Sequence, residues 1–293
     1  MGLVRQAGHE LTADADEADI LVVNTCAFID EAKQESIDAI LEMAQKKLSK
    51  TGSGRAQRLV VTGCLGERYR DELKKEIPEI DAVLGTGDVP EIVAAVTGAR
   101  APGASPLTFY RPNTTDAAAK PEPTYLYDAS TPRYTSTPGH YAYIKIAEGC
   151  DYTCAFCIIP TLRGSYRSRT EDSVVAEAEA LAARGVRELL LISQDTTFYG
   201  RDRDSRPGDP LKQRGALARL LRRLNAVEGL EWIRLLYLYP TTITDDTLDA
   251  MAECEKVCKY VDLPLQHASA DVLRRRRRPG TPQAYDKLLA RLP

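Results

Sequence analysis

Three cysteines lie within eight positions of one another in the segment EGCDYTCAFCIIP, residues 148 to 160. Cys150, Cys154 and Cys157 carry thiolates, the soft ligands that bind iron, iron–sulfur clusters and zinc. No further cysteine follows for almost a hundred residues, so the segment is one ligand short of a closed tetrahedral site. Three thiolates on one loop can hold three irons of a four-iron cluster, and the fourth iron then stays open to a substrate or cosubstrate.

A structural zinc site is the alternative interpretation of the same cysteines. It needs a fourth ligand, for which His140 and His267 are the candidates, and it usually uses CxxC pairs. The spacing here is the asymmetric CxxxCxxC, and Cys150 directly follows a predicted strand. The pattern therefore favours an iron–sulfur cluster and leaves zinc open.

Four strands are predicted after residue 140, and each precedes a helical pattern. This alternation predicts right-handed crossovers and a parallel sheet, with Cys150 at the carboxyl end of the first strand, where such proteins hold cofactors. A barrel needs more than four strands to cover its interior, so we expect a partial (β/α) barrel that is incomplete at its C-terminal end. The predicted strands are YAYIKIAE, ELLLISQD, WIRLLYLYP and YVDLPLQH.

The first hundred residues repeat the same unit of strand, turn and helix, which makes the whole chain an α/β protein. The predicted strands ILVVNTC, RLVVTGC and DAVLG begin at residues 20, 58 and 81. Cys26 and Cys64 each end a strand just before a helix, so a parallel sheet brings both thiols to the same edge. Such cysteines are either ligands or small buried hydrophobes, and their position alone leaves both interpretations open.

Composition divides the chain into three segments. Residues 1–100 form the predicted N-terminal domain and residues 141–293 the predicted C-terminal domain. Residues 101–140 hold seven of the 17 prolines, and proline has no backbone N–H to donate to a helix or sheet. We therefore expect an interdomain linker there.

The bulk composition is that of an ordinary globular protein, with 43% hydrophobic and 28% charged residues in a chain of 293. The sequence contains no apolar run of about 18 residues and no signal-peptide pattern, so we expect a cytoplasmic protein without a membrane segment. In that reducing compartment the seven cysteines are interpreted as ligands or catalytic groups rather than as disulfides. The net charge of −3 argues against a positive field over the whole chain, although not against a local basic patch.

The CxxxCxΦC pattern, with the aromatic Phe156 before the last cysteine, resembles the signature of radical S-adenosylmethionine (SAM) enzymes. The resemblance implies that the three cysteines hold a four-iron cluster whose open iron binds the methionine part of SAM. Reductive cleavage of SAM in these enzymes yields a 5′-deoxyadenosyl radical. The resemblance also implies that Phe156 lies near the adenine and that Gln194, in SQD after the second strand, binds the SAM amino group. A solvated polar group is the alternative for Gln194.

The stretches VVNTCAFIDEAKQESIDAI and VVTGCLGERYRDEL resemble the N-terminal domain of methylthiotransferases within the radical SAM enzymes. In that family three cysteines at three strand ends hold a second four-iron cluster, so Cys26 and Cys64 are its predicted ligands here. The third cysteine normally precedes the helix that corresponds to MGLVRQAGHEL, and a small C-terminal β-barrel normally follows the radical SAM core. The resemblance therefore implies a chain that is truncated at both ends, with the first strand and one ligand of the second cluster missing.

Further stretches resemble the methylthiotransferases that modify a ribosomal protein rather than tRNA. NTCAFIDEA, ISQDTTFYG, LYLYPTTITDD and DLPLQHAS are similar to the members that act on an aspartate of small-subunit ribosomal protein twelve. The resemblance implies transfer of a methylthio group to the β-carbon of that aspartate, with a cellular reductant as a further partner. The alternatives are a tRNA adenosine methylthiotransferase, an inactive fragment and a zinc-stabilised binding module.

Three further groups of residues have two interpretations each. Arg169 either pairs with a carboxylate, of SAM or of an acidic substrate, or lies on a solvated face. The run from Arg274 to Arg278 either contacts ribosomal RNA or forms a solvated basic helix end. Cys254 and Cys258 are four apart on a predicted helix and share one face, where packing is favoured over ligation.

Overall fold

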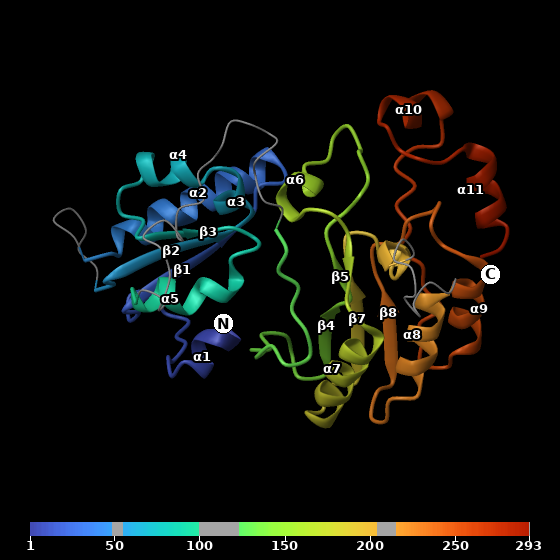
Figure 1. Cartoon of the computed structure of the whole chain (residues 1–293), viewed down its shortest axis with the longest axis horizontal. Coiled ribbons are helices and arrows are strands. Elements are labelled where there is room, and N and C mark those ends of the chain that lie inside the picture. Colours follow the sequence, from blue (N-terminus) through green and yellow to red (C-terminus); the bar gives the residue numbers. More distant parts are fainter. Residues whose placement is uncertain (49–54, 100–122, 204–214, 293) are drawn as a thin grey trace. The chain divides into compact units, whose positions relative to one another are not determined.

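The computed structural model describes residues 1–48, 55–99, 123–203 and 215–292, and the chain falls into two compact units (Figure 1). Residues 101–122 of the predicted linker lie outside the described residues. Unit 1 contains Met1–Tyr125, Thr131–Tyr134 and Thr161–Arg163, and unit 2 contains Leu126–Ser130, Thr135–Pro160 and Gly164–Pro293.

A parallel sheet with the strand order β1-β2-β3 forms the centre of unit 1. The central strand β2 is fully buried at Leu59, Val60 and Val61, as expected of a parallel strand that is covered on both faces. Thr25 pairs with Gly63, so β1 and β2 end side by side. The elements are α1 (Gly2–Gln6), β1 (Ile20–Thr25), α2 (Asp30–Gln45), β2 (Arg58–Gly63), α3 (Cys64–Arg68), α4 (Arg70–Glu76), β3 (Ala82–Leu84), η1 (Val89–Glu91) and α5 (Ile92–Thr97).

Unit 2 also contains a parallel sheet, with the strand order β4-β7-β8. The sheet and the apolar face of α8 share one core, in which Leu189, Leu191, Leu220 and Leu221 are fully buried. Parallel sheets in both halves confirm the predicted α/β fold class. The elements are β4 (Tyr141–Lys145), β5 (Ala147–Glu148), α6 (Ile159–Arg163, whose residues Thr161–Arg163 belong to unit 1), β6 (Arg167–Ser168), α7 (Glu171–Ala183), β7 (Glu188–Ile192), η2 (Thr196–Phe198), η3 (Arg201–Arg203), α8 (Ala216–Asn225), β8 (Trp232–Leu235), α9 (Asp245–Glu253), α10 (Ala270–Arg275) and α11 (Pro282–Leu289).

The fourth predicted strand, residues 260–267, does not form as a regular strand. This part of the chain follows β8 only through single contacts, such as a 3.0 Å hydrogen bond from the N–H of Leu238 to the carbonyl of Asp262. Pro264 has no N–H to donate, and Gln266 adopts a φ of 68°, so neither residue can continue a ladder. The prediction of a fourth strand is wrong, and the sheet of unit 2 has three strands within the described residues.

The helix predicted across Cys254 and Cys258 is shorter than expected. Helix α9 ends at Glu253, and Cys254 is its C-cap residue. The N–H of Cys258 donates to the carbonyl of Ile233 at 2.9 Å, beside β8. The prediction that the two cysteines share a helix face is therefore wrong, although Cys254 is buried in the core as its packing interpretation required.

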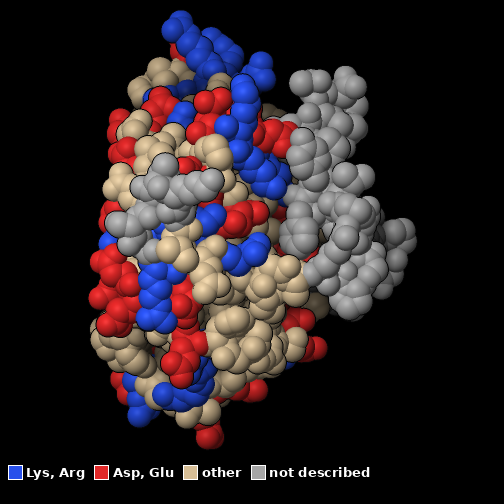
Figure 2. Space-filling view, turned by 90° about the vertical axis from the view of Figure 1, so that its left-hand side faces the viewer, with Lys and Arg blue, Asp and Glu red and all other residues tan. Residues whose placement is uncertain are grey.

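The surface carries charges of both signs. Figure 2 shows acidic and basic side chains interspersed over the face that it views. This mixture agrees with the near balance of 39 basic and 42 acidic residues in the sequence. Within the ranges that the structure describes, no helix is both long and apolar enough to cross a membrane.

Candidate functional site

Cys150, Cys154 and Cys157 lie on the loop that follows β5, and all three are half-buried. Backbone hydrogen bonds fix this loop at three points. The N–H of Cys150 donates to the carbonyl of Gly164 at 3.1 Å, and the N–H of Cys157 donates to the carbonyl of Cys154 at 3.1 Å. The N–H of Ala155 donates to the carbonyl of Arg276 at 2.9 Å. The thiols are therefore presented by a backbone that is held from outside the loop as well as within it.

Gly149 permits the chain to enter this loop. Its φ is 89°, and a Cβ at this position would lie 2.1 Å from the carbonyl oxygen of Ser165. Replacing Gly149 with alanine is expected to destabilise unit 2 by about 2 kcal/mol or more and to lower the iron bound after anaerobic reconstitution, because the loop must move. The thermal midpoint and the iron content per chain measure both effects.

Gly139 provides the matched control for this substitution. A Cβ there has no atom within 4 Å and its φ needs no glycine, so Gly139→Ala is expected to change the stability by less than about 0.5 kcal/mol. Equal stability and equal iron content in the two variants would contradict the assigned role of Gly149.

The environments of Cys150 and Cys157 disfavour the ionised form of their thiols in the absence of a cation. Burial is the main reason that the pKa of the Cys150 thiol is raised to about 11; a hydrogen bond from the Tyr152 backbone opposes the shift, and the nearby charges of Cys157, Asp195 and Cys154 add to it. Burial also raises the pKa of the Cys157 thiol. A cationic group that binds here must therefore displace protons, as iron does when it takes up thiolate ligands.

The zinc alternative requires a fourth ligand beside the three cysteines. Among the residues that the structure describes, no three or more His, Cys, Asp or Glu side chains surround a point that could hold one metal ion. His140 directly precedes β4 and so lies at the end of that strand away from the cysteine loop. The Nδ1 atom of His267 accepts a hydrogen bond from the N–H of Ser269 at 2.8 Å. Three thiols on one loop fit the donor set of an iron–sulfur cluster.

Asp195 joins the end of β7 to the cysteine loop. Its carboxylate is 1% exposed and accepts hydrogen bonds from the hydroxyls of Tyr152, Thr197 and Thr242 at 3.0, 2.6 and 3.0 Å. Burial raises the pKa of Asp195, and these hydrogen bonds oppose that shift. Because Tyr152 lies between Cys150 and Cys154, the network holds the middle of the loop against the sheet.

Two aromatic rings and a guanidinium form a stack beside the cysteines, called here the Tyr152–Tyr239–Arg278 stack. The rings of Tyr152 and Tyr239 are 4.4 Å apart and nearly parallel, at 15°. The guanidinium carbon of Arg278 lies 4.1 Å from the centre of the Tyr239 ring. The stack therefore connects the cysteine loop to the loop after β8 and to the arginine run.

The position of Gln194 fits its predicted role, whereas the position of Phe156 does not test its own. The side-chain oxygen of Gln194 is buried and has no hydrogen-bond partner among the described residues. Such an unsatisfied acceptor costs about 1–3 kcal/mol, which a bound N–H group would recover, so the placement fits the predicted contact with the SAM amino group. Phe156 is 48% exposed, with the guanidinium carbon of Arg276 at 5.3 Å from its ring centre. Its contact with an adenine stays a prediction.

Arg169 is placed differently from the prediction. Its guanidinium is 2% exposed and forms a buried ion pair with Glu177. It also donates to the carbonyl of Lys145 at 3.0 Å and to the Ser173 hydroxyl at 2.8 Å, and it lies 5.1 Å from the Tyr127 ring centre. These partners engage Nη1 and Nη2, whereas Nε is buried without a hydrogen-bond partner among the described residues. The contacts favour a structural role for Arg169, and its role in cofactor binding stays a prediction.

The arginine run is not a uniform basic surface. Arg274 to Arg277 are exposed, and Arg274 pairs with Asp271 at 2.5 Å. Arg278 is 9% exposed and turns into the stack beside the cysteines. The interpretation as a solvated helix end therefore fails for Arg278, and contact of the exposed members with RNA stays a prediction.

The sequence analysis missed Tyr152, Asp195, Tyr239 and Arg278 as parts of the site. Tyr152 lies within the cysteine motif, and Asp195 is next to Gln194. The sequence positions of these two residues could therefore have indicated that they belong to the site. No local pattern pointed to Tyr239 or Arg278, because the fold brings them to the loop from far along the chain.

Cys26 and Cys64 end neighbouring strands of unit 1, directly after the paired residues Thr25 and Gly63. Adjacent strands are about 4.8 Å apart, so the two cysteines reach the same edge of the sheet. Cys26 is exposed and Cys64 is buried at 7%. In the same unit, the Nη2 atom of Arg163 lies 3.7 Å from the sulfur of Cys64. The donor set suits a soft metal or cluster, and this role stays a prediction.

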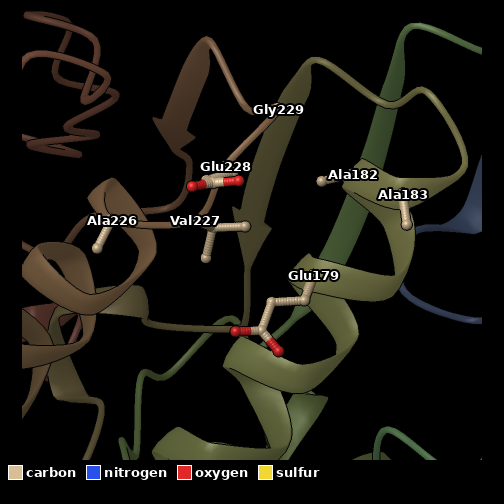
Figure 3. Close-up of a pocket in the computed structure, with 7 residues that line it drawn as sticks. All are labelled: Glu179, Ala182, Ala183, Ala226, Val227, Glu228 and Gly229. Carbon is tan, nitrogen blue, oxygen red and sulfur yellow. The ribbon is translucent and has the colours of Figure 1, made fainter.

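A pocket of unit 2 lies away from the cysteine loop of that unit (Figure 3). It lies between the end of α7 and the turn before β8, at the amino ends of the strands, whereas parallel α/β proteins bind their ligands at the carboxyl ends. It offers two carboxylates and no cysteine, so we assign it no chemistry. The residues that line it are Glu179, Ala182, Ala183, Ala226, Val227, Glu228 and Gly229.

Relatives with curated names match the chain along most or all of its length. Proteins named ribosomal protein uS12 methylthiotransferase RimO from Koribacter versatilis and Symbiobacterium thermophilum are 48% and 49% identical to it, over 95% and 100% of this chain. A protein of the same name from Trichlorobacter lovleyi is 45% identical over 100% of this chain. The chain spans 59%, 55% and 60% of the lengths of these three relatives.

Solved structures with low sequence identity share the fold. A radical S-adenosylmethionine methyltransferase, TsrM, from Kitasatospora setae matches 99% of this chain and 56% of its own, with a TM-score of 0.58 and 17% identity. The cobalamin-dependent S-adenosylmethionine radical enzyme OxsB matches 94% of this chain and 39% of its own, with a TM-score of 0.57 and 11% identity.

Two family models match the chain. Residues 1–85 match UPF0004, which is described as an uncharacterised protein family. Residues 144–293, which are 150 of the 293 residues and include the cysteine loop, match the radical SAM superfamily. The chain therefore belongs to the radical SAM superfamily.

Proposed function

We propose that this chain is the part of a ribosomal protein uS12 methylthiotransferase that carries its iron–sulfur chemistry, and that the enzyme adds a methylthio group to the β-carbon of an aspartate of uS12. The observation that carries the proposal is the 44–49% identity to proteins of that name along nearly the whole chain. The three-cysteine loop supports it, because it lies within residues 144–293, which match the radical SAM superfamily.

Radical SAM proteins use a four-iron cluster and SAM, which supply a carbon-centred radical able to remove a hydrogen atom from an unactivated carbon. Cys150, Cys154 and Cys157 would hold that cluster and leave one iron free for SAM. The orphaned oxygen of Gln194 would accept a hydrogen bond from the SAM amino group. Asp195 orients the loop through Tyr152 and does not itself contact the cofactor in this assignment.

The N-terminal cysteines support the second half of the proposal. Cys26 and Cys64 would be ligands of a second four-iron cluster, with which the transferred sulfur is associated. In this proposal, residues 1–100 form the methylthiotransferase domain and residues 141–293 the radical SAM core. Both clusters need reduced thiolate ligands and a supply of electrons, which a reducing compartment provides. We therefore propose a cytoplasmic enzyme.

Methylthiolation of uS12 by the anaerobically reconstituted protein tests this function. The protein is incubated with SAM, a reductant and a sulfide source, together with either uS12 or bulk tRNA. We expect uS12 to gain the mass of one methylthio group in place of one hydrogen, at a single aspartate. A product on tRNA adenosine with uS12 unmodified would replace this proposal with the tRNA alternative.

A further inference from the structure

We propose that Arg278 and Tyr239 form a carboxylate-binding pair beside the cysteine loop. The proposal extends the proposed function, and its part that concerns the target aspartate rests on that function. Two carboxylates could occupy the pair during such a reaction, the α-carboxylate of SAM and the side-chain carboxylate of the target aspartate. Both offer the same planar, anionic acceptor to a guanidinium.

The first argument is the burial of an unpaired cation. Arg278 is 9% exposed, and no carboxylate pairs with it in the part of the chain that the structure describes. Its Nη2 atom donates to the backbone carbonyl of Pro264 at 3.0 Å, its guanidinium donates to the hydroxyl of Tyr285, and it stacks on the ring of Tyr239. These groups are neutral, and a buried charge without a counter-ion is costly. The fold therefore maintains a positive charge at a place where an anion would lower the free energy.

The second argument is the presence of unused donors. The Nε atom of Arg278 and the hydroxyl of Tyr239 are both buried and have no hydrogen-bond partner among the described residues. Tyr239 is 6% exposed, and its ring is held between Tyr152 and Arg278. Buried polar atoms in proteins are nearly always satisfied, so two orphans on one stacked pair indicate a ligand with acceptor atoms. A carboxylate supplies two such oxygens.

The third argument is the location of the pair. Tyr239 stacks on Tyr152, which lies between Cys150 and Cys154, and the backbone of Arg276 binds the loop at Ala155. A carboxylate bound here would lie beside the cluster, where SAM and the target residue of the substrate must both be held.

A comparison of ligands with and without a carboxylate tests the pair. SAM and decarboxylated SAM are titrated onto the reconstituted protein, and so are uS12 peptides with aspartate or asparagine at the target position. The variants are Arg278→Gln and Tyr239→Phe, the second of which removes only the hydroxyl and keeps the stack. The control is Arg275→Gln, an exposed position of the same arginine run. Circular dichroism and iron content report whether each variant is assembled.

In the wild type, removal of the carboxylate from the correct ligand is expected to weaken its binding by about tenfold or more. The ratio of the two dissociation constants, without and with the carboxylate, measures this discrimination. Arg278→Gln should bring the ratio to about one, Tyr239→Phe should reduce it several-fold, and Arg275→Gln should leave it unchanged. Loss of discrimination with SAM alone assigns the pair to SAM, and loss with the peptides alone assigns it to the substrate. If Arg278→Gln does not assemble, Tyr239→Phe decides.

If assembled variants keep the wild-type preference for the carboxylate form of both ligands, the proposal is overturned. A shifted reduction potential of the cluster in those variants would not rescue it, because Arg278 would then act on the cluster instead. The SAM arm needs no activity on uS12. A wild type that binds SAM but neither binds nor modifies uS12 would contradict the proposed function and leave the SAM comparison to decide the role of the pair.

Discussion

Replacement of Cys157 by alanine is expected to abolish reductive cleavage of SAM. The loop would keep two thiolates, which cannot fix a four-iron cluster with a single open iron. Iron at the loop should fall severalfold, and formation of 5′-deoxyadenosine should drop below detection, a loss of at least about 10³-fold in rate. Iron and sulfide analysis and quantification of 5′-deoxyadenosine under anaerobic, reducing conditions measure both effects.

Cys258→Ala is the matched control, because Cys258 is also half-buried in unit 2 but lies beside β8 and outside the loop. It should keep the iron content and the 5′-deoxyadenosine yield of the wild type. Cleavage of SAM by Cys157→Ala at the rate of this control would refute the assigned ligand set. Zinc without iron or sulfide in the wild-type protein would refute the cluster itself.

Arg169→Met is expected to cause the largest loss of stability among substitutions outside the cysteine loop. The variant leaves Glu177 as a buried, uncompensated charge that is 4% exposed, and breaking such a pair costs about 3–5 kcal/mol. For a unit of this size the unfolding midpoint should fall by about 10 °C, measured by thermal scans of the wild type and the variant without cofactors.

Two further variants test whether the loss of stability comes from breaking the buried ion pair or from replacing any arginine. The double variant Arg169→Met/Glu177→Met removes both charges and should recover most of the loss, because apolar side chains of similar volume replace the pair. Arg222→Met breaks the exposed pair of Arg222 and Glu253, whose side chains are 46% and 60% exposed, and should cost less than about 1 kcal/mol. A midpoint for Arg169→Met equal to that of Arg222→Met would contradict the structural role of Arg169.

The sequence predicted the elements that have strong local signals. The β-branched runs at residues 20, 58 and 81 gave strands in a parallel sheet, and the cysteine motif was placed correctly after the first strand of the second half. The signals failed where the local pattern conflicted with backbone geometry. The apolar run at residues 260–267 is interrupted by Pro264 and by the positive φ of Gln266, so it does not form a strand.

Charged residues were the least predictable part of the site. Arg169 and Arg278 look alike in sequence, since both are arginines within basic surroundings. The fold buries both, but it supplies Arg169 with Glu177 and gives Arg278 no carboxylate among the described residues. Whether an arginine is structural or available to a ligand depends on partners from other elements, and the spacing of residues along the chain does not predict those partners.

The hydrogen bond between the cysteine loop and the arginine run also sets an order of events during biosynthesis. Ala155 and Arg276 are about 120 residues apart in the chain, so a ribosome that synthesises roughly 5–20 residues per second needs on the order of 10 s to pass from one to the other. Until Arg276 emerges, the loop lacks this hydrogen bond. It is therefore a contact that the loop can form only after most of unit 2 has been synthesised.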